Sequence, residues 1–160
     1  MDVSSLSTRD LLTLHARIEN LLRERKITRS SNNPAGDLAE KLFEKAFGWT
    51  LTGNSHKHTD AIGPDGSRYQ IKARRMTKYN SSRQLSAIRD LRGANFDFLA
   101  CVLFEENYGV LRAAIIPYST VVEHSQFVAH TNSFKFFLRE GVWEIPGVRD
   151  ETANLRSVAL

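Results

Sequence analysis

Apolar residues in the first fifty positions recur at helical spacing. The first set consists of Leu11, Leu12, Leu14, Ile18, Leu21 and Leu22. Its spacing predicts an amphipathic helix over about 7–25, with Ser7 and Asp10 as a capping-box-like pair at its start. After a polar, turn-like stretch at 29–33, a proline suited to a first helical turn opens a second predicted helix over 34–47.

Beyond residue 48 the pattern changes to that of strands. Residues 49–52 alternate and predict a short strand, and 58–75 predict a hairpin. The polar stretch 76–83 predicts a loop. Residues 96–104 are almost continuously apolar, which is typical of a central strand covered on both faces, and 110–117 predict another strong strand.

The remaining segments give shorter elements. We expect helices over 85–91 and 120–129, the second opened by a capping-box pattern. A late ribbon of strands is predicted over 133–138 and 142–145, and Asp150 is placed to cap a final helix that ends near residue 156. This order of elements predicts a single α/β domain, with a mixed central β-sheet flanked by helices.

Composition narrows the classes of protein to which the chain can belong. It has 160 residues, of which 41% are hydrophobic and 25% charged, as is ordinary for one globular domain. No apolar run reaches the length of a membrane span and the start lacks a signal-peptide pattern, so we expect a cytoplasmic protein. Cys101 is the only cysteine, which excludes an internal disulfide and a cysteine metal cluster. It lies in an apolar strand and is expected in the core.

The basic residues are more informative than the net charge of +4. They form two clusters, Arg23, Arg25, Lys26 and Arg29, and then Lys72, Arg74, Arg75, Lys78 and Arg83. A modest basic excess is compatible with a polyanionic partner. The second cluster follows directly on the predicted hairpin.

The hairpin brings chemically useful side chains together. Pro64-Asp65-Gly66 is a turn signal, because proline presets φ and glycine accepts a positive φ. Folding about this turn sets Asp60 opposite Gln70 and His58 opposite Lys72. Residues two apart share a strand face, so an acid, an amide oxygen and an ammonium converge. The sequence therefore predicts a site for one divalent metal and one phosphate.

The two histidines at the start of the hairpin leave a zinc site as an alternative. His56 and His58 stand at i, i+2 and can share a face, with Asp60 as a third ligand. No further histidine, cysteine or acid stands nearby at ligand spacing, so this alternative is the weaker one.

An acid before a short hairpin, then Gln-x-Lys, with a glutamate on an earlier helix, resembles the PD-(D/E)xK nuclease superfamily. The segments that carry the resemblance are Gly36-Asp37-Leu38-Ala39-Glu40, Asp60 and Gln70-Ile71-Lys72. The Gln-x-Lys variant is most similar to the Mrr-type restriction endonuclease branch. The sequence departs from the family pattern in two ways: Thr59 replaces the proline before the acid, and Gln70 replaces a carboxylate.

The resemblance covers roughly residues 30–118 and implies a restriction endonuclease-like three-layer fold. We expect an N-terminal helix over 1–28, a nuclease core over 30–118 and an extension over 119–160. The implied activity is metal-dependent hydrolysis of DNA phosphodiester bonds, in restriction or defence.

The same resemblance implies roles for individual residues. Asp60, Gln70, the backbone carbonyl of Ile71 and Glu40 would hold Mg²⁺, for which Mn²⁺ can substitute. Glu40 borders the apolar face of its helix, from which it can lean over a sheet. Lys72 would orient the attacking water or stabilise charge on the phosphate. The residues expected to contact DNA are Arg74, Arg75, Lys78 and His58.

A cut through both strands of a duplex needs two such sites, so we expect a homodimer. The apolar stripe of the first helix is a candidate interface, unless it packs on its own domain. Two rival functions stay open: a catalytically inactive nuclease-like DNA-binding module, and a protein-interaction subunit whose basic clusters meet an acidic partner. The neutral Gln70 and the missing proline favour the first rival.

Overall fold

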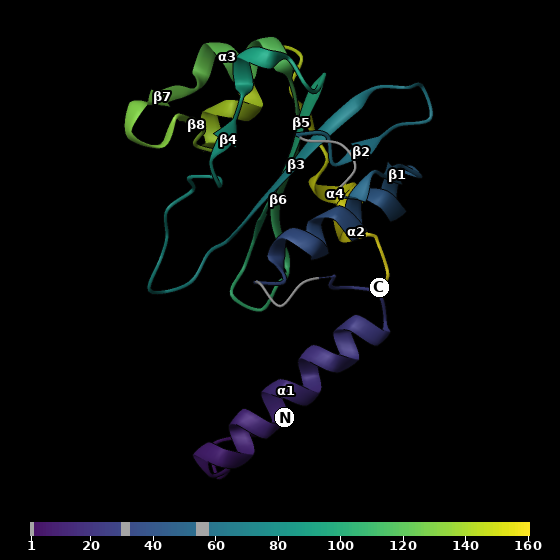
Figure 1. The fold of residues 1–160 in the computed structure, drawn as a ribbon, viewed down its shortest axis with the longest axis vertical. Helices are drawn as coiled ribbons and strands as arrows, with labels where there is room; N and C mark the ends of the chain where they lie inside the picture. Colours follow the sequence, from purple (N-terminus) through teal and green to yellow (C-terminus); the bar gives the residue numbers. More distant parts are fainter. Residues whose placement is uncertain (1, 30–32, 54–57) are drawn as a thin grey trace.

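The computed structural model describes residues 2–29, 33–53 and 58–160, which fold around a six-stranded mixed sheet (Figure 1). In spatial order its strands are β1 (Thr50–Leu51), β2 (Ala61–Ile62), β3 (Arg68–Arg75), β5 (Phe98–Phe104), β6 (Val110–Pro117) and β9 (Arg149–Asp150). Strands β3 and β5 are parallel, and all the other pairs are antiparallel. The α/β class and the mixed sheet predicted from the sequence are therefore confirmed.

Helices cover one face of this sheet. Helix α2 (Ala35–Phe47) packs there with α4 (Thr152–Arg156). The core on this face, the first of two, contains stacked aromatic rings from four segments: the Phe43 and Trp49 ring centroids are 5.3 Å apart, and those of Tyr69 and Phe98 are 5.5 Å apart. This packing fixes the position of α2 against β3.

The second face is covered in a different way. A small sheet lies there, formed by β4 (Ile88–Arg89), β8 (Ser133–Lys135) and β7 (Gln126–Val128), together with α3 (Tyr118–His124). Cys101 of β5 is fully buried in this second core, and burial raises the pKa of its thiol. The expectation that this cysteine is a core residue is confirmed.

Helix α1 (Thr8–Glu24) stands away from the rest of the domain (Figure 1). Its predicted cap is present, because the Ser7 hydroxyl oxygen accepts a hydrogen bond from the Asp10 amide at 3.2 Å. None of its residues is buried, and Leu12 is 67% exposed. The apolar stripe therefore does not pack on its own domain. Within the described ranges, no helix combines the length and the apolar character that crossing a bilayer requires.

Three expectations about local structure were wrong. Residues 85–91 contain the strand β4 followed by a 3₁₀ turn, and not a helix. Leu85, Ile88 and Leu91 are all buried, so their helix-like spacing of three arises from an irregular path along the second core. The helix expected over 120–129 already ends at His124, and the strand expected over 142–145 belongs to a 3₁₀ helix at Glu140–Glu144.

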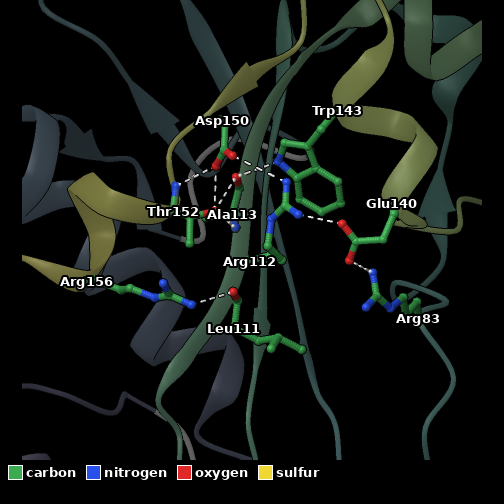
Figure 2. Close-up of polar contacts among 9 residues, drawn as sticks. All are labelled: Arg83, Leu111, Arg112, Ala113, Glu140, Trp143, Asp150, Thr152 and Arg156. Atoms are coloured by element: carbon green, nitrogen blue, oxygen red, sulfur yellow. Dashed lines mark hydrogen bonds and ion pairs between the residues drawn. The ribbon is translucent and has the colours of Figure 1, made fainter.

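A network of charged groups ties the loop after β3 to the C-terminal segments (Figure 2). Glu140 accepts hydrogen bonds from Arg83 at 2.6 Å and from Arg112 at 2.5 Å. Arg112 also contacts Asp150 at 3.3 Å, and its guanidinium carbon lies 3.9 Å from the centroid of the Trp143 ring. The charge of Arg83, a member of the second basic cluster, is therefore matched within the fold.

Two glycines of α2 give a test of the local backbone. Gly48 ends the helix with φ at +66°, and Gly36 lies inside its first turn; a Cβ atom at either position meets nothing within 4 Å. We expect Gly48→Ala to lower the free energy of unfolding by about 1 kcal/mol, because a side chain is strained in the left-handed region. Gly36→Ala should raise it by about 0.5 kcal/mol through helix propensity. Urea denaturation measures both changes, and a shared sign would contradict this description of the helix.

Candidate active site

The β2–β3 hairpin holds Asp60 beside Gln70, as its turn predicted. Ala61 pairs with Tyr69, and Gly66 has φ at +83° in the turn. The Asp60 amide donates to the Tyr69 carbonyl at 2.8 Å, and the Asp60 Oδ2 oxygen accepts a hydrogen bond from the Ile71 amide at 2.7 Å. The carboxylate thus takes the place of the next backbone acceptor along β3.

The same hydrogen bond orients the Ile71 carbonyl. The N–H and C=O groups of one strand residue point toward the same edge of the strand. Because the Ile71 amide points to Asp60, its carbonyl points to the Asp60 side of β3 and not to β5. This is the direction in which the predicted backbone ligand has to face.

Alternate residues of β3 belong to different layers. Tyr69, Ile71 and Ala73 pack in the core under α2. Gln70 and Lys72 are paired in register with Leu99 and Cys101, which belong to the second core. Gln70, Lys72 and Arg74 therefore share the face that lies away from α2.

Two polar atoms on this face are buried without partners. Gln70 is 4% exposed, and its Oε1 oxygen has no hydrogen bond with the described residues. The Nε atom of Arg74 is also buried and unbonded in the described part of the chain. A buried carbonyl oxygen without a hydrogen bond destabilises the folded state, and a bound cation or water molecule can offset this cost.

Burial lowers the pKa of Lys72. Removal of its ammonium from water lowers the Lys72 pKa below the ordinary value of 10.5. The negative charge of Asp60 raises this pKa and the positive charge of Arg89 lowers it further. The two opposing groups identify Asp60 and Arg89 as electrostatic neighbours of Lys72.

Glu40 is the predicted site residue that the structure does not join to this group. It lies on α2, is 18% exposed and forms an ion pair with Arg29. Gly36, four residues earlier on the same side of α2, lines a cavity of about 480 Å³ that Lys72 and Arg74 also line. This cavity lies where the open edge of β3 meets the start of α2. Glu40 is not among the residues that line it, and among the described residues it has no hydrogen bond or ion pair to Asp60, Gln70 or Lys72.

The residues predicted to contact DNA fall into different environments. Arg75 is used by the fold, since it donates to the Glu106 carbonyl at 2.9 Å and lies over the Tyr108 ring. Arg74 is on the same face of β3 as Lys72, and its role in DNA contact stays a prediction. Lys78 is exposed beside Tyr79 in the loop after β3.

Of the two histidines at the start of the hairpin, only His58 belongs to the described residues. His58 has φ at +67° and lines a separate cavity with Arg89. No group of three or more histidine, cysteine, aspartate and glutamate side chains is close enough to hold a metal in the described ranges. Because His56 lies outside the described residues, the zinc alternative stays an untested prediction.

Sequence reasoning missed Arg89 and the partner of Glu40. Arg89 was assigned to a helix, whereas β4 brings it within electrostatic range of Lys72. No local sequence pattern predicts that Arg89 lies near Lys72, because this proximity depends on the pairing of β4 with β8. Arg29 belonged to a noted basic cluster, but its pairing with Glu40 depends on how the chain enters α2.

The opposing effects of Asp60 and Arg89 on Lys72 can be measured separately. In metal-free buffer, Asp60→Asn should lower the Lys72 pKa further, because it removes the charge that favours the ammonium. Arg89→Gln should raise the pKa, because it removes a like charge. NMR titration of the lysine side chain gives both values. Shifts of the same sign in the two variants would contradict the arrangement of charges.

A comparison of the sequence with models of protein families gives no match, and neither does a comparison with curated proteins. The functional assignment of this chain therefore depends on the geometry of the hairpin and its surroundings.

Proposed function

We propose that this chain is a cytoplasmic, metal-dependent endonuclease with a restriction endonuclease-like core that hydrolyses phosphodiester bonds of DNA. The observation that carries the proposal is the meeting, on one hairpin, of an oriented carboxylate, an unpartnered amide oxygen and a half-buried lysine. The mixed sheet with layers on both faces agrees with the three-layer architecture that the PD-(D/E)xK resemblance implies.

The oxygen atoms at the open edge of β3 suit a hard divalent cation. The Asp60 Oδ1 oxygen accepts no hydrogen bond from the described residues, and neither does the Gln70 Oε1 oxygen. The Ile71 carbonyl faces the same side. Mg²⁺ prefers a few protein oxygens of this kind and completes its shell with water and phosphate, and Mn²⁺ accepts the same ligands. A bound ion would supply a more acidic water and a counter-charge for the phosphate.

Lys72 has the charge and the position to assist this chemistry. In the proposal its ammonium orients the attacking water and balances the charge that grows on the phosphate oxygens. Its lowered pKa means that Nζ releases a proton more readily than an ordinary lysine. Arg74, on the same face, binds the phosphate on the downstream side. Glu40 acts from α2 through water, with Arg29 as its counter-ion.

One feature favours the second candidate function, a nuclease-like DNA-binding module without turnover. Asp60 is the one hairpin carboxylate placed near Lys72, since Asp65 bonds to Ser67 in the turn, and Glu40 is engaged with Arg29. A site with one carboxylate and a neutral Gln70 binds a divalent cation weakly. The module would keep the basic groups and the fold while losing the metal.

The exposed α1 fits the expectation of a homodimer. Leu11, Ile18 and Leu21 remain exposed on this helix, which stands away from the domain. In the proposal two copies bury these residues against each other, which gives the two active sites that a double-strand cut requires.

Cleavage of supercoiled plasmid tests the proposed activity. The wild type should nick or linearise the plasmid with Mg²⁺ or Mn²⁺ and should be inactive in EDTA. Lys72→Ala and the bulkier Lys72→Met should each reduce the rate at least about a hundredfold, because both remove a charge that stabilises the transition state. Lys45→Ala is the matched control, since Lys45 lies at the far end of α2 and bonds to the Ala159 carbonyl.

The possible outcomes separate the two candidate functions. Cleavage that persists in EDTA, or that is equal in the wild type and both Lys72 variants, would refute the assigned site. Absence of cleavage on plasmid, linear, branched and single-stranded DNA, with binding retained, would identify the binding module. Circular dichroism of each variant verifies that the fold is intact.

A further inference from the structure

A second cavity of about 680 Å³ opens beside the candidate site, on the side of the small sheet. Its wall comes from β4, the 3₁₀ turn after it, and the β7–β8 ribbon. The lining residues used in the argument are two arginines, two phenylalanines, an aspartate and an asparagine: Arg89, Arg92, Phe127, Phe134, Asp90 and Asn132. None of these residues has a role in the hydrolysis proposed above.

An arginine stacked on aromatic rings forms one part of the wall. The Phe127 and Phe134 ring centroids are 5.2 Å apart, and the Arg92 guanidinium carbon lies 5.2 Å from the first and 5.6 Å from the second. Phe127 is 47% exposed, and Arg92 is exposed as well. Aromatic rings and planar guanidinium groups are the surfaces on which nucleic-acid bases stack.

The remaining groups supply the rest of a nucleotide site. Arg89 and His58 line the cavity and provide donors for a phosphate. Asp90 and Asn132 provide the acceptors and donors that read base edges. The Asp90 carboxylate also accepts a hydrogen bond from the Asn95 side-chain amide at 2.8 Å, which holds it in place on the wall.

Two residues join this cavity to the hairpin. His58 precedes the candidate metal ligand Asp60 by two positions. Arg89 is close enough for its charge to lower the pKa of Lys72. A strand whose phosphate lies at Lys72 therefore has a neighbouring nucleotide within reach of the cavity.

We propose that this cavity binds one unpaired nucleotide of a DNA strand, with its base against Phe127 and Arg92 and its phosphate at Arg89 and His58. A base inside a duplex cannot offer its face to a protein ring unless it leaves the stack. The substrate is then DNA that carries an unpaired or extruded nucleotide next to the cleavage position. This inference rests on the proposed function for its link to cleavage, but not for the binding itself.

Binding without metal tests the proposal independently of cleavage. Fluorescence anisotropy in EDTA compares a labelled short single strand with the fully paired duplex of the same sequence. We expect Arg92→Ala and Phe127→Ala each to weaken single-strand binding about tenfold, because stacking of one base contributes that much. Duplex binding should change much less. Phe127→Leu keeps apolar contact with Phe134 and should show part of the loss, which guards against a folding defect.

The chain offers a matched control for Arg92. Arg139 is also exposed and lies over a phenylalanine, with its guanidinium carbon 4.7 Å from the Phe137 centroid, but it does not line this cavity. Arg139→Ala should weaken binding less than about twofold, as expected for loss of a distant charge. Equal losses in Arg92→Ala and Arg139→Ala would overturn the proposal and indicate general attraction to phosphate.

Further outcomes distinguish a DNA strand from a free nucleotide as the occupant, and failure of the cavity proposal from failure of the nuclease proposal. Displacement of the labelled strand by a deoxynucleoside monophosphate as effectively as by an unlabelled strand would overturn a strand as the occupant in favour of a free nucleotide. Equal weakening of duplex binding would refute the preference for unpaired DNA. If the wild type does not cleave DNA but Arg92→Ala still loses single-strand binding, the nucleotide site in the cavity is supported and only the nuclease activity is refuted.

Discussion

The hydrogen bond from the Ile71 amide to the Asp60 carboxylate determines how the candidate site is built. It ends the pairing of β3 with β2, because a side chain takes the place of a backbone acceptor. From that point the edge of β3 is open toward the start of α2. The same bond orients Asp60, turns the Ile71 carbonyl to the open edge and leaves Gln70 and Lys72 on the adjacent face. Loss of this contact would free the Asp60 carboxylate, whereas the pairing with β5 would still hold Gln70 and Lys72.

The two cores of the domain have different consequences for this edge. The aromatic stack under α2 is largely buried and fixes the backbone of β3 from one side. The second core ends near Gln70 and Lys72, so polar atoms are buried there at the border of an apolar layer. Burial of such groups is costly unless they gain partners. Gln70 Oε1 has no partner among the described residues, and Lys72 has a lowered pKa; perturbed groups of this kind cluster at functional sites.

Local signals in the sequence were sufficient for the hairpin and insufficient for its surroundings. The Pro64-Asp65-Gly66 turn and the alternation of β3 predicted the register, because both depend on residues close in sequence. The strand β4 was mistaken for a helix, since Leu85, Ile88 and Leu91 have helical spacing but are buried by contacts with the distant β8 ribbon. The proximity of Arg89 to Lys72 follows from that long-range pairing, so no local pattern contained it.

Arg89 lines the second cavity and also acts electrostatically on Lys72, so the two proposed sites would be coupled through it. In the free protein its positive charge acts on Lys72 and lowers the pKa of the ammonium. A nucleotide phosphate bound at Arg89 would offset that charge, so the Lys72 pKa would rise and the ammonium would be favoured. The ammonium form is the one that stabilises a developing phosphate anion. Binding at the cavity and readiness for hydrolysis at the hairpin would be linked by electrostatics alone, without any movement of the backbone.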